Sequence, residues 1–367
     1  MLKTVQIKST RAFSDDLLTR YRQQGDPPAD AVIAAVVDAD GHKGLGQFMQ
    51  WLGNTTDFAI GTQLPVVQAF FRQYAQLPPW ADAARMQRGR AFFGRNVGLI
   101  GLSLGTCSLP YTYLGADGVR VLWMTERIKN DTARRLQETG EWVLAVNDAK
   151  SWLAASAPES TLPEASLAAV YTLKIRLIHA AVRHYVLSSG KWDLAWGYPV
   201  NQEDMAGTNL SFSYIVLRAM RKMDVPLTEQ EQEDYLHHIN VVGWLNGVTD
   251  DLIAHNLREA FHLDRAIVRR QFKESEGGRG LTKALLDAIA QIAGTANPGK
   301  PGEQPAISPE QARSFTAGQI RFLLGEQHAN WLGVPNVPFE KRVTSLITRL
   351  PIFSKLVAAG QFTKMPG

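Results

Sequence analysis

The sequence predicts an all-α protein, on three observations. Apolar residues recur at the three- and four-residue spacing of one helix face, and several segments open with helix-capping patterns. There is also no series of alternating strands joined by hairpin turns. Because no internal repeat or clear domain boundary interrupts this pattern, we expect a single large helical domain over residues 1–367.

Two expected helices lie in the middle of the chain. Residues 130–146 are amphipathic, with apolar side chains spaced to cover one face. Further on, Thr161–Glu164 has the form of a capping box with a proline in the first turn. We expect a helix to run from there to about Ser189, where Gly190 supplies the stop.

The later part of the chain carries two more helix starts, at Thr228–Glu231 and Ser308–Gln311. Proline and glycine cluster at 25–28, at 77–80 and most heavily at 294–309. The last of these reads as a flexible connector rather than a domain boundary. About 60 residues follow it, which is enough for two or three helices packed back on the body.

Composition excludes several classes of protein. Hydrophobic residues make up 45% of the 367 and charged residues 20%, as in a soluble globular protein. The net charge is only +4 and the basic residues are scattered among acids, so a pI near 9.1 does not indicate nucleic-acid binding. A single cysteine, Cys107, excludes an intramolecular disulfide framework and a cysteine-based metal cluster.

Nothing in the sequence predicts a membrane span. The most apolar stretch, Val97–Pro110, is shorter than the roughly 20 residues that cross a bilayer. The first residues lack the uninterrupted apolar region and cleavage site of a signal peptide. We therefore expect a soluble, cytoplasmic protein, with a processed secreted form left open.

The most informative stretch is residues 176–185, which read RLIHAAVRHY. At about 100° per residue, Arg176 and Arg183 fall within roughly 60° of His179 on one helix face, whereas His184 points about 140° away. A haem uses such a face, with an imidazole for iron, apolar walls for the porphyrin and cations for the propionates. Taken alone, the residues also allow a histidine that merely packs in the core, and arginines that pair with protein carboxylates.

Further motifs resemble a known family. They are LPPWAD at 77–82, RLIHAAVRH at 176–184, GYPVNQEDMAGTNLSFS at 197–213 and YLHHINVVGWLNGV at 235–248. In order and spacing they are similar to the latex-clearing protein family of rubber oxygenases, and to fungal oxygenases that cleave farnesyl side chains. The resemblance runs from about Leu64 to Val334.

The resemblance implies an all-helical protein with a globin-like core, additional helices and a non-covalently bound haem b. His179 matches the family's proximal iron ligand, and Arg176, Arg183 and His184 match the charged residues beside it. The absence of a CxxCH motif agrees with non-covalent haem. The family cleaves carbon–carbon double bonds of isoprenoid chains with dioxygen, so the expected partners are dioxygen and an apolar small molecule or polyisoprenoid, with no nucleic acid.

One departure concerns the substrate. Rubber-cleaving relatives carry arginine, two residues, lysine and threonine on a distal helix, and the lysine can cap the iron. The best match here is Arg135, Glu138 and Thr139, which share one helix face but put glutamate in place of lysine. If Glu138 faces the cofactor, it is placed to act as a base near bound oxygen. The loss of the lysine would also put rubber itself in doubt as the substrate. The alternative is an exposed polar surface.

Other groups of polar residues are less informative about function. Glu259 and His262 have the E-x-x-H spacing of di-iron bundles, but only Asp234 and His237 approach a second copy, so solvated helix charges explain them better. Asn201–Asp204 places carboxylates at a helix start, and its recurrence in the family suggests that it braces the haem-bearing helix. Three function classes therefore stand: an alkene-cleaving haem oxygenase, a non-catalytic haem protein such as a gas sensor or store, and a di-iron oxygenase.

Overall fold

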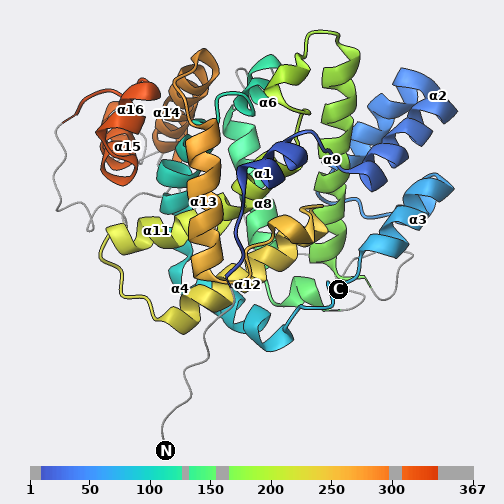
Figure 1. The fold of residues 1–367 in the computed structure, drawn as a ribbon, viewed down its shortest axis with the longest axis horizontal. Coiled ribbons are helices and arrows are strands. Elements are labelled where there is room, and N and C mark those ends of the chain that lie inside the picture. Colours follow the sequence, from blue (N-terminus) through green and yellow to red (C-terminus); the bar gives the residue numbers. More distant parts are fainter. Residues whose placement is uncertain (1–9, 126–131, 154–164, 297–307, 338–367) are drawn as a thin grey trace, which may run out of the picture.

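The computed structural model describes residues 10–125, 132–153, 165–296 and 308–337. Within these ranges the chain forms helices joined by short loops, and the single β feature there is an isolated antiparallel bridge between Gly115 and Phe272. The predicted all-α fold is confirmed (Figure 1).

Long α-helices alternate with short helical turns along the chain. In order, they are α1 (Asp15–Arg22), α2 (Pro27–Gly53), η1 (Ile60–Thr62), α3 (Pro65–Tyr74), α4 (Ala83–Ser103), η2 (Leu104–Ser108), α5 (Leu109–Thr112), α6 (Val119–Met124), α8 (Thr132–Asn147), η3 (Lys150–Trp152), α9 (Leu167–Ser188), η4 (Leu194–Trp196), α10 (Gln202–Phe212), α11 (Tyr214–Lys222), α12 (Glu229–Leu245), η5 (Asp250–Leu252), α13 (Leu257–Gln271), α14 (Glu276–Ala296), α15 (Pro309–Leu324) and α16 (Glu326–Trp331).

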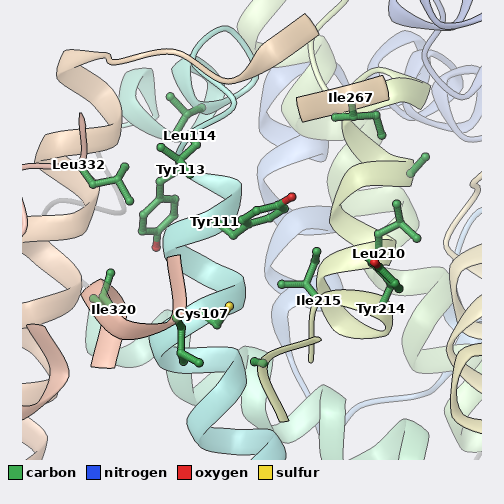
Figure 2. Packing of buried hydrophobic residues seen from close by; sticks show 14 of the residues in the cluster. Cys107, Tyr111, Tyr113, Leu114, Leu210, Tyr214, Ile215, Ile267, Ile320 and Leu332 are labelled. Carbon is green, nitrogen blue, oxygen red and sulfur yellow. The ribbon is translucent and has the colours of Figure 1, made fainter. Parts of the chain in front are cut away.

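Buried apolar side chains form two clusters that share helices. One joins the N-terminal segment to α5, α10 and α13–α16, and Figure 2 shows part of it. The other joins α2, α3, α8 and α9. Helix α12 supplies Leu236 to the first cluster and Tyr235 to the second, and α4 divides Leu102 and Phe92 in the same way. The two clusters are therefore parts of one helical body.

Helices α4 and α12 approach each other closely because α4 has a glycine at the contact. A Cβ on Gly89 would lie 2.6 Å from the carbonyl oxygen of Asp234 and 2.8 Å from the Cβ of His238. Any larger residue would force the helices apart. This contact fixes the central pair of helices against which α8 and α9 are placed.

Helix α9 begins later than the sequence pattern predicted. The capping box at Thr161–Glu164 lies outside the described residues, and the helix starts at Leu167. Ser166 is the N-cap, with extended backbone and a hydroxyl that accepts a hydrogen bond from the amide of Ala169. The predicted end is confirmed, because the helix stops at Ser188 and Gly190 follows with φ of +66°.

Other local expectations are confirmed where the structure describes them. Helix α8 covers the amphipathic segment from Thr132, and both later capping boxes form, at Thr228 and at Ser308. Most of the 294–309 connector lies outside the described residues, so its flexibility stays a prediction. None of the helices in the described ranges is both long and apolar enough to cross a membrane.

Candidate functional site

Helix α9 carries the residues singled out by the sequence and lies between α2 and α8 (Figure 1). Trp142 Nε1 of α8 donates to Thr172 Oγ1 of α9 over 3.2 Å. The positive charge of Arg135, earlier on α8, acts on His179, later on α9. The two helices are therefore antiparallel neighbours, with Arg135 and His179 at corresponding heights.

His179 is partly buried and has the properties of a metal ligand. Burial, together with the charge of Arg183, lowers the pKa of its imidazole to about 4. The ring is therefore neutral at neutral pH and keeps a nitrogen lone pair free of a proton. Its Nδ1 is buried and has no hydrogen-bond partner in the part of the chain that the structure describes.

Arg176 is held by Asp26, the residue just before the start of α2. Its Nε and NH2 donate to the two carboxylate oxygens of Asp26 over 2.6 and 2.8 Å, and both side chains are buried. The guanidinium also lies over the rings of Tyr74 and Phe70. Of the partners considered from the sequence, the structure thus gives Arg176 a protein carboxylate, just before the start of α2.

Arg183 is buried more deeply and is only partly satisfied. Its Nε donates to Asp30 Oδ1 over 2.6 Å and its NH1 to the carbonyl oxygen of Val200 over 3.2 Å. Its NH2 is buried and, among the described residues, unpartnered. One donor of this guanidinium therefore remains for another acceptor on the His179 face.

His184 lies on a different side of α9, as its spacing predicts. Its ring is 6.2 Å from that of His42 on α2, centre to centre. The Nε2 of His184 is buried without a partner in the described ranges. The structure thus keeps His184 near α2 and apart from the face that His179 shares with Arg183.

The three distal candidates on α8 differ in position. Arg135 acts electrostatically on His179 and on the buried hydroxyl of Tyr113. Glu138 Oε1 accepts a hydrogen bond from Arg134 Nε over 2.8 Å, and the Glu138 side chain is 44% exposed.

Burial, with smaller effects of the charges of Glu141 and Glu138, raises the pKa of Tyr171, which stands eight residues before His179 on α9. Thr139 is exposed. Of the three, Arg135 is thus the residue whose charge acts on His179.

Residues 93–353 match the family described as ER-bound oxygenase mpaB/B'/Rubber oxygenase, catalytic domain. The chain belongs to this family.

Two relatives show how far the likeness extends. The rubber oxygenase of Streptomyces sp. (strain K30) is 30% identical over 285 residues, which cover 73% of this chain and 64% of that protein. The match therefore spans less than two thirds of that relative. The structure of latex clearing protein LCP in the closed state matches with a TM-score of 0.67 at 21% identity, over 94% of this chain and 86% of that one. This second likeness shows a shared fold.

The residues around His179 fit the haem that the family resemblance implies. A neutral imidazole suits iron, and the NH2 of Arg183 suits a propionate, because neither His179 Nδ1 nor that NH2 has a partner within the described part of the chain. The di-iron alternative finds less support, because Glu259 is bound by Arg11 and Asp234 by Arg88. Within the described ranges, no three His, Cys, Asp or Glu side chains are placed to share a metal ion.

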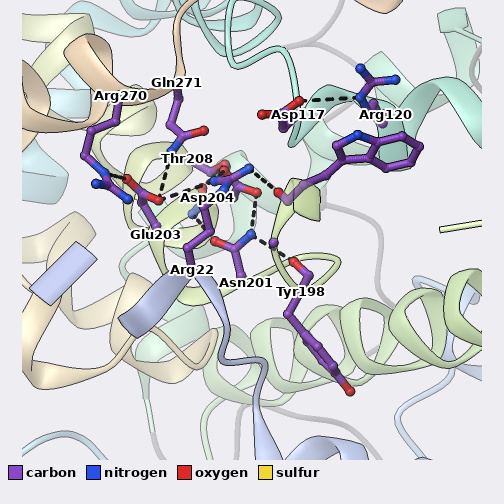
Figure 3. Close-up of polar contacts among 12 residues, drawn as sticks. Arg22, Asp117, Arg120, Tyr198, Asn201, Glu203, Asp204, Thr208, Arg270 and Gln271 are labelled. Carbon is purple, nitrogen blue, oxygen red and sulfur yellow. Dashed lines mark hydrogen bonds and ion pairs between the residues drawn. The ribbon is translucent and has the colours of Figure 1, made fainter. Parts of the chain in front are cut away.

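The Asn201–Asp204 motif forms a buried brace (Figure 3). Asn201 caps α10, and the fully buried Glu203 accepts hydrogen bonds from Arg22, Arg270 and Gln271. These contacts join α1, α10 and α13.

The link from this brace to α9 is indirect. Gln202 donates to the carbonyl oxygen of Gly25, the residue before Asp26, which binds Arg176. The brace thus holds the backbone next to Asp26, the residue that binds Arg176 on α9.

The sequence reasoning missed Asp26 and Asp30, the carboxylates that hold the α9 arginines. A signal was present. The two aspartates are four residues apart at a helix start, and the arginines are seven apart, so both pairs present one face.

Proposed function

We propose that this protein is a haem-b-dependent oxygenase that cleaves carbon–carbon double bonds of an apolar, isoprenoid-like substrate with dioxygen, giving two carbonyl ends. The observation that carries the proposal is His179, a neutral imidazole whose buried Nδ1 has no partner among the described residues, in a chain of this oxygenase family. When bound, the haem supplies an iron centre able to bind dioxygen.

Each residue near the proposed centre has a distinct task. His179 holds the iron, and Arg183 offers its NH2 to a propionate. Arg176 is a positioning residue, because its ion pair with Asp26 fixes α9 against α2.

The proposed chemical step uses residues of α8. Glu138 takes an allylic proton from the substrate on Oε2, because its Oε1 is engaged by Arg134. Arg135 and Thr139 steady the developing negative charge. With glutamate where rubber-cleaving relatives carry lysine, we propose a substrate other than rubber itself, drawn from shorter or differently shaped isoprenoids.

A non-catalytic haem protein is the second candidate. The ion pair of Glu138 with Arg134 and the 44% exposure of its side chain favour it, because a base needs access to the substrate rather than to water. Both candidates share the haem, so turnover separates them.

The first experiment tests the cofactor. The purified protein, supplied with haem, should show a Soret band at one haem per chain, and His179→Ala should abolish it while leaving helical circular dichroism unchanged. His184→Ala is the matched control on another side of the same helix and should leave the haem stoichiometry much closer to that of the parent. Full haem occupancy in His179→Ala would refute the assignment.

The second experiment tests turnover. The haem-loaded protein under air should convert an isoprenoid alkene into two carbonyl products, scored by a carbonyl reagent. Glu138→Gln should slow this reaction by a factor of about 100 or more while sparing haem binding. An unchanged rate would remove Glu138 as the base, and absence of carbonyl products from a range of isoprenoid lengths would favour the sensor or store.

A further inference from the structure

A second group of polar side chains lies around Trp152 of η3, beyond the end of α8 that is opposite to Arg135. Trp152 Nε1 and His238 Nε2 both meet the carbonyl oxygen of Val146, over 2.7 and 3.0 Å. The His238 and Trp152 rings lie 5.7 Å apart, and the Arg90 guanidinium lies 5.9 Å from the Trp152 ring. Helices α4, α8 and α12 therefore meet at this point.

Three buried polar atoms of this group have no partner among the described residues. They are His238 Nδ1 from α12, Arg90 Nε from α4 and Asn147 Oδ1 from α8. His238 is fully buried and Asn147 nearly so. Leaving such atoms unsatisfied costs about 1–3 kcal/mol each, so native proteins almost always give them a partner.

The hydrogen-bonding role of each atom follows from its neighbours. A carbonyl oxygen only accepts, so His238 Nε2 carries the proton and donates to Val146. Burial lowers the pKa of His238 to about 3, so the ring is neutral and Nδ1 is an acceptor. Asn147 Nδ2 donates to Val143, which leaves Oδ1 as an acceptor, whereas Arg90 Nε is a donor.

Two acceptor atoms and one donor atom restrict which kind of molecule can bind here. An anion would suit Arg90 but be repelled by two acceptor lone pairs, and a cation would suit the acceptors but be repelled by the guanidinium. A neutral molecule that both donates and accepts satisfies all three atoms. We propose that one ordered water molecule binds here, donating to His238 Nδ1 and Asn147 Oδ1 and accepting from Arg90 Nε.

The close packing of α4 and α12 places Arg90 and His238 at the same contact between the two helices. Gly89, the neighbour of Arg90, lies so close to His238 that a Cβ on it would be 2.8 Å from the histidine Cβ. The water ties the C-terminal end of α8 to both helices. It is thus a positioning element for the helix that carries Arg135.

The first test needs no variant. In the full chain, nitrogen NMR should find His238 as the neutral tautomer protonated on Nε2, and a crystal structure should show one water within hydrogen-bond distance of His238 Nδ1 and Arg90 Nε. A proton on Nδ1, a direct bond between these side chains, or an ion at the position would overturn the proposal.

The second test removes one partner. Arg90→Met deletes the Nε donor, which bonds no other described residue, and also removes the guanidinium from beside the Trp152 ring. Losing a hydrogen bond worth about 0.5–1.5 kcal/mol should speed amide exchange at Val146 and Asn147 by roughly 2- to 13-fold.

The matched control is Arg95→Met on the same helix, where the arginine pairs with Glu231 at the surface. It should leave these exchange rates unchanged. Equal effects of the two variants, or none from Arg90→Met, would refute a bound water as the link.

Discussion

Replacing Arg176 tests whether this arginine serves the fold through Asp26 or the cofactor directly. Arg176→Met keeps much of the side-chain volume but removes the guanidinium, and leaves the buried Asp26 carboxylate without the donors that now reach it over 2.6 and 2.8 Å. Removing one partner of a buried ion pair typically costs 3–5 kcal/mol, because the remaining charge is uncompensated. The lost contact with Tyr74 adds about 0.5–2 kcal/mol.

The assay is urea unfolding of the protein without haem, followed by circular dichroism. We expect Arg176→Met to lower the free energy of unfolding by about 3.5–7 kcal/mol, the ion-pair and ring contributions together, and Arg176→Met with Asp26→Leu to cost clearly less than the sum of the single changes. The coupling measures the pair itself, free of any cofactor.

A second readout separates the two roles. If Arg176 instead held a propionate, its loss would weaken haem retention by roughly 10- to 150-fold, the equivalent of about 1.5–3 kcal/mol, with little effect on the haem-free protein. A change in unfolding free energy below about 1 kcal/mol, or strict additivity with Asp26→Leu, would refute the reasoning from the buried pair.

Three further predictions concern buried groups. The pKa of His238 is about 3 in the folded chain and about 6.5 in the unfolded chain, so the unfolded chain binds more protons between these pH values. Stability should therefore fall as the pH drops from 6.5 towards 3. His238→Phe should flatten this part of the profile of unfolding free energy against pH. Lys174, which donates to the carbonyl oxygens of Asn54 and Asp57, has its pKa lowered by burial to about 8. Stability should therefore rise between pH 8 and 10.5, and Lys174→Met should abolish the rise; a slope that persists would contradict it. Gly247→Ala should lower the free energy of unfolding in urea by more than about 1 kcal/mol, because φ at this position is +93° and the new Cβ would lie 2.4 Å from Asp26 Oδ2. An unchanged free energy of unfolding would contradict this prediction.

Much of the fold and part of the candidate site followed from local patterns. The capping boxes at Thr228 and Ser308 form because their hydrogen bonds join residues three apart. For the same reason, the common face of His179 and Arg183 could be expected once that segment was taken as a helix. The predicted start of α9 was wrong by a few residues, because the sequence offers two capping residues and the helix uses Ser166, so that it begins at Leu167.

Long-range partners could not be predicted in this way. Asp26 and Asp30 lie about 150 residues before the arginines they bind, and nothing in a helical period connects positions so far apart. The pairing of Glu138 with Arg134 is local, but which side of α8 turns towards α9 depends on how the two helices pack. The meeting of Arg90, Asn147 and His238 around Trp152 depends on packing in the same way.

The sequence by itself determined that this chain is helical, that it belongs with the rubber oxygenases and that His179 stands with two arginines on one helix face, because helix geometry and motif order are written along the chain. Tertiary structure alone decided that Asp26 and Asp30 hold those arginines, that one nitrogen of Arg183 has no partner among the described residues, and that the charge of Arg135 reaches His179. The physical reason is that burial removes water as a partner, so each buried charge depends on whichever group the packing of distant helices brings within about 3 Å.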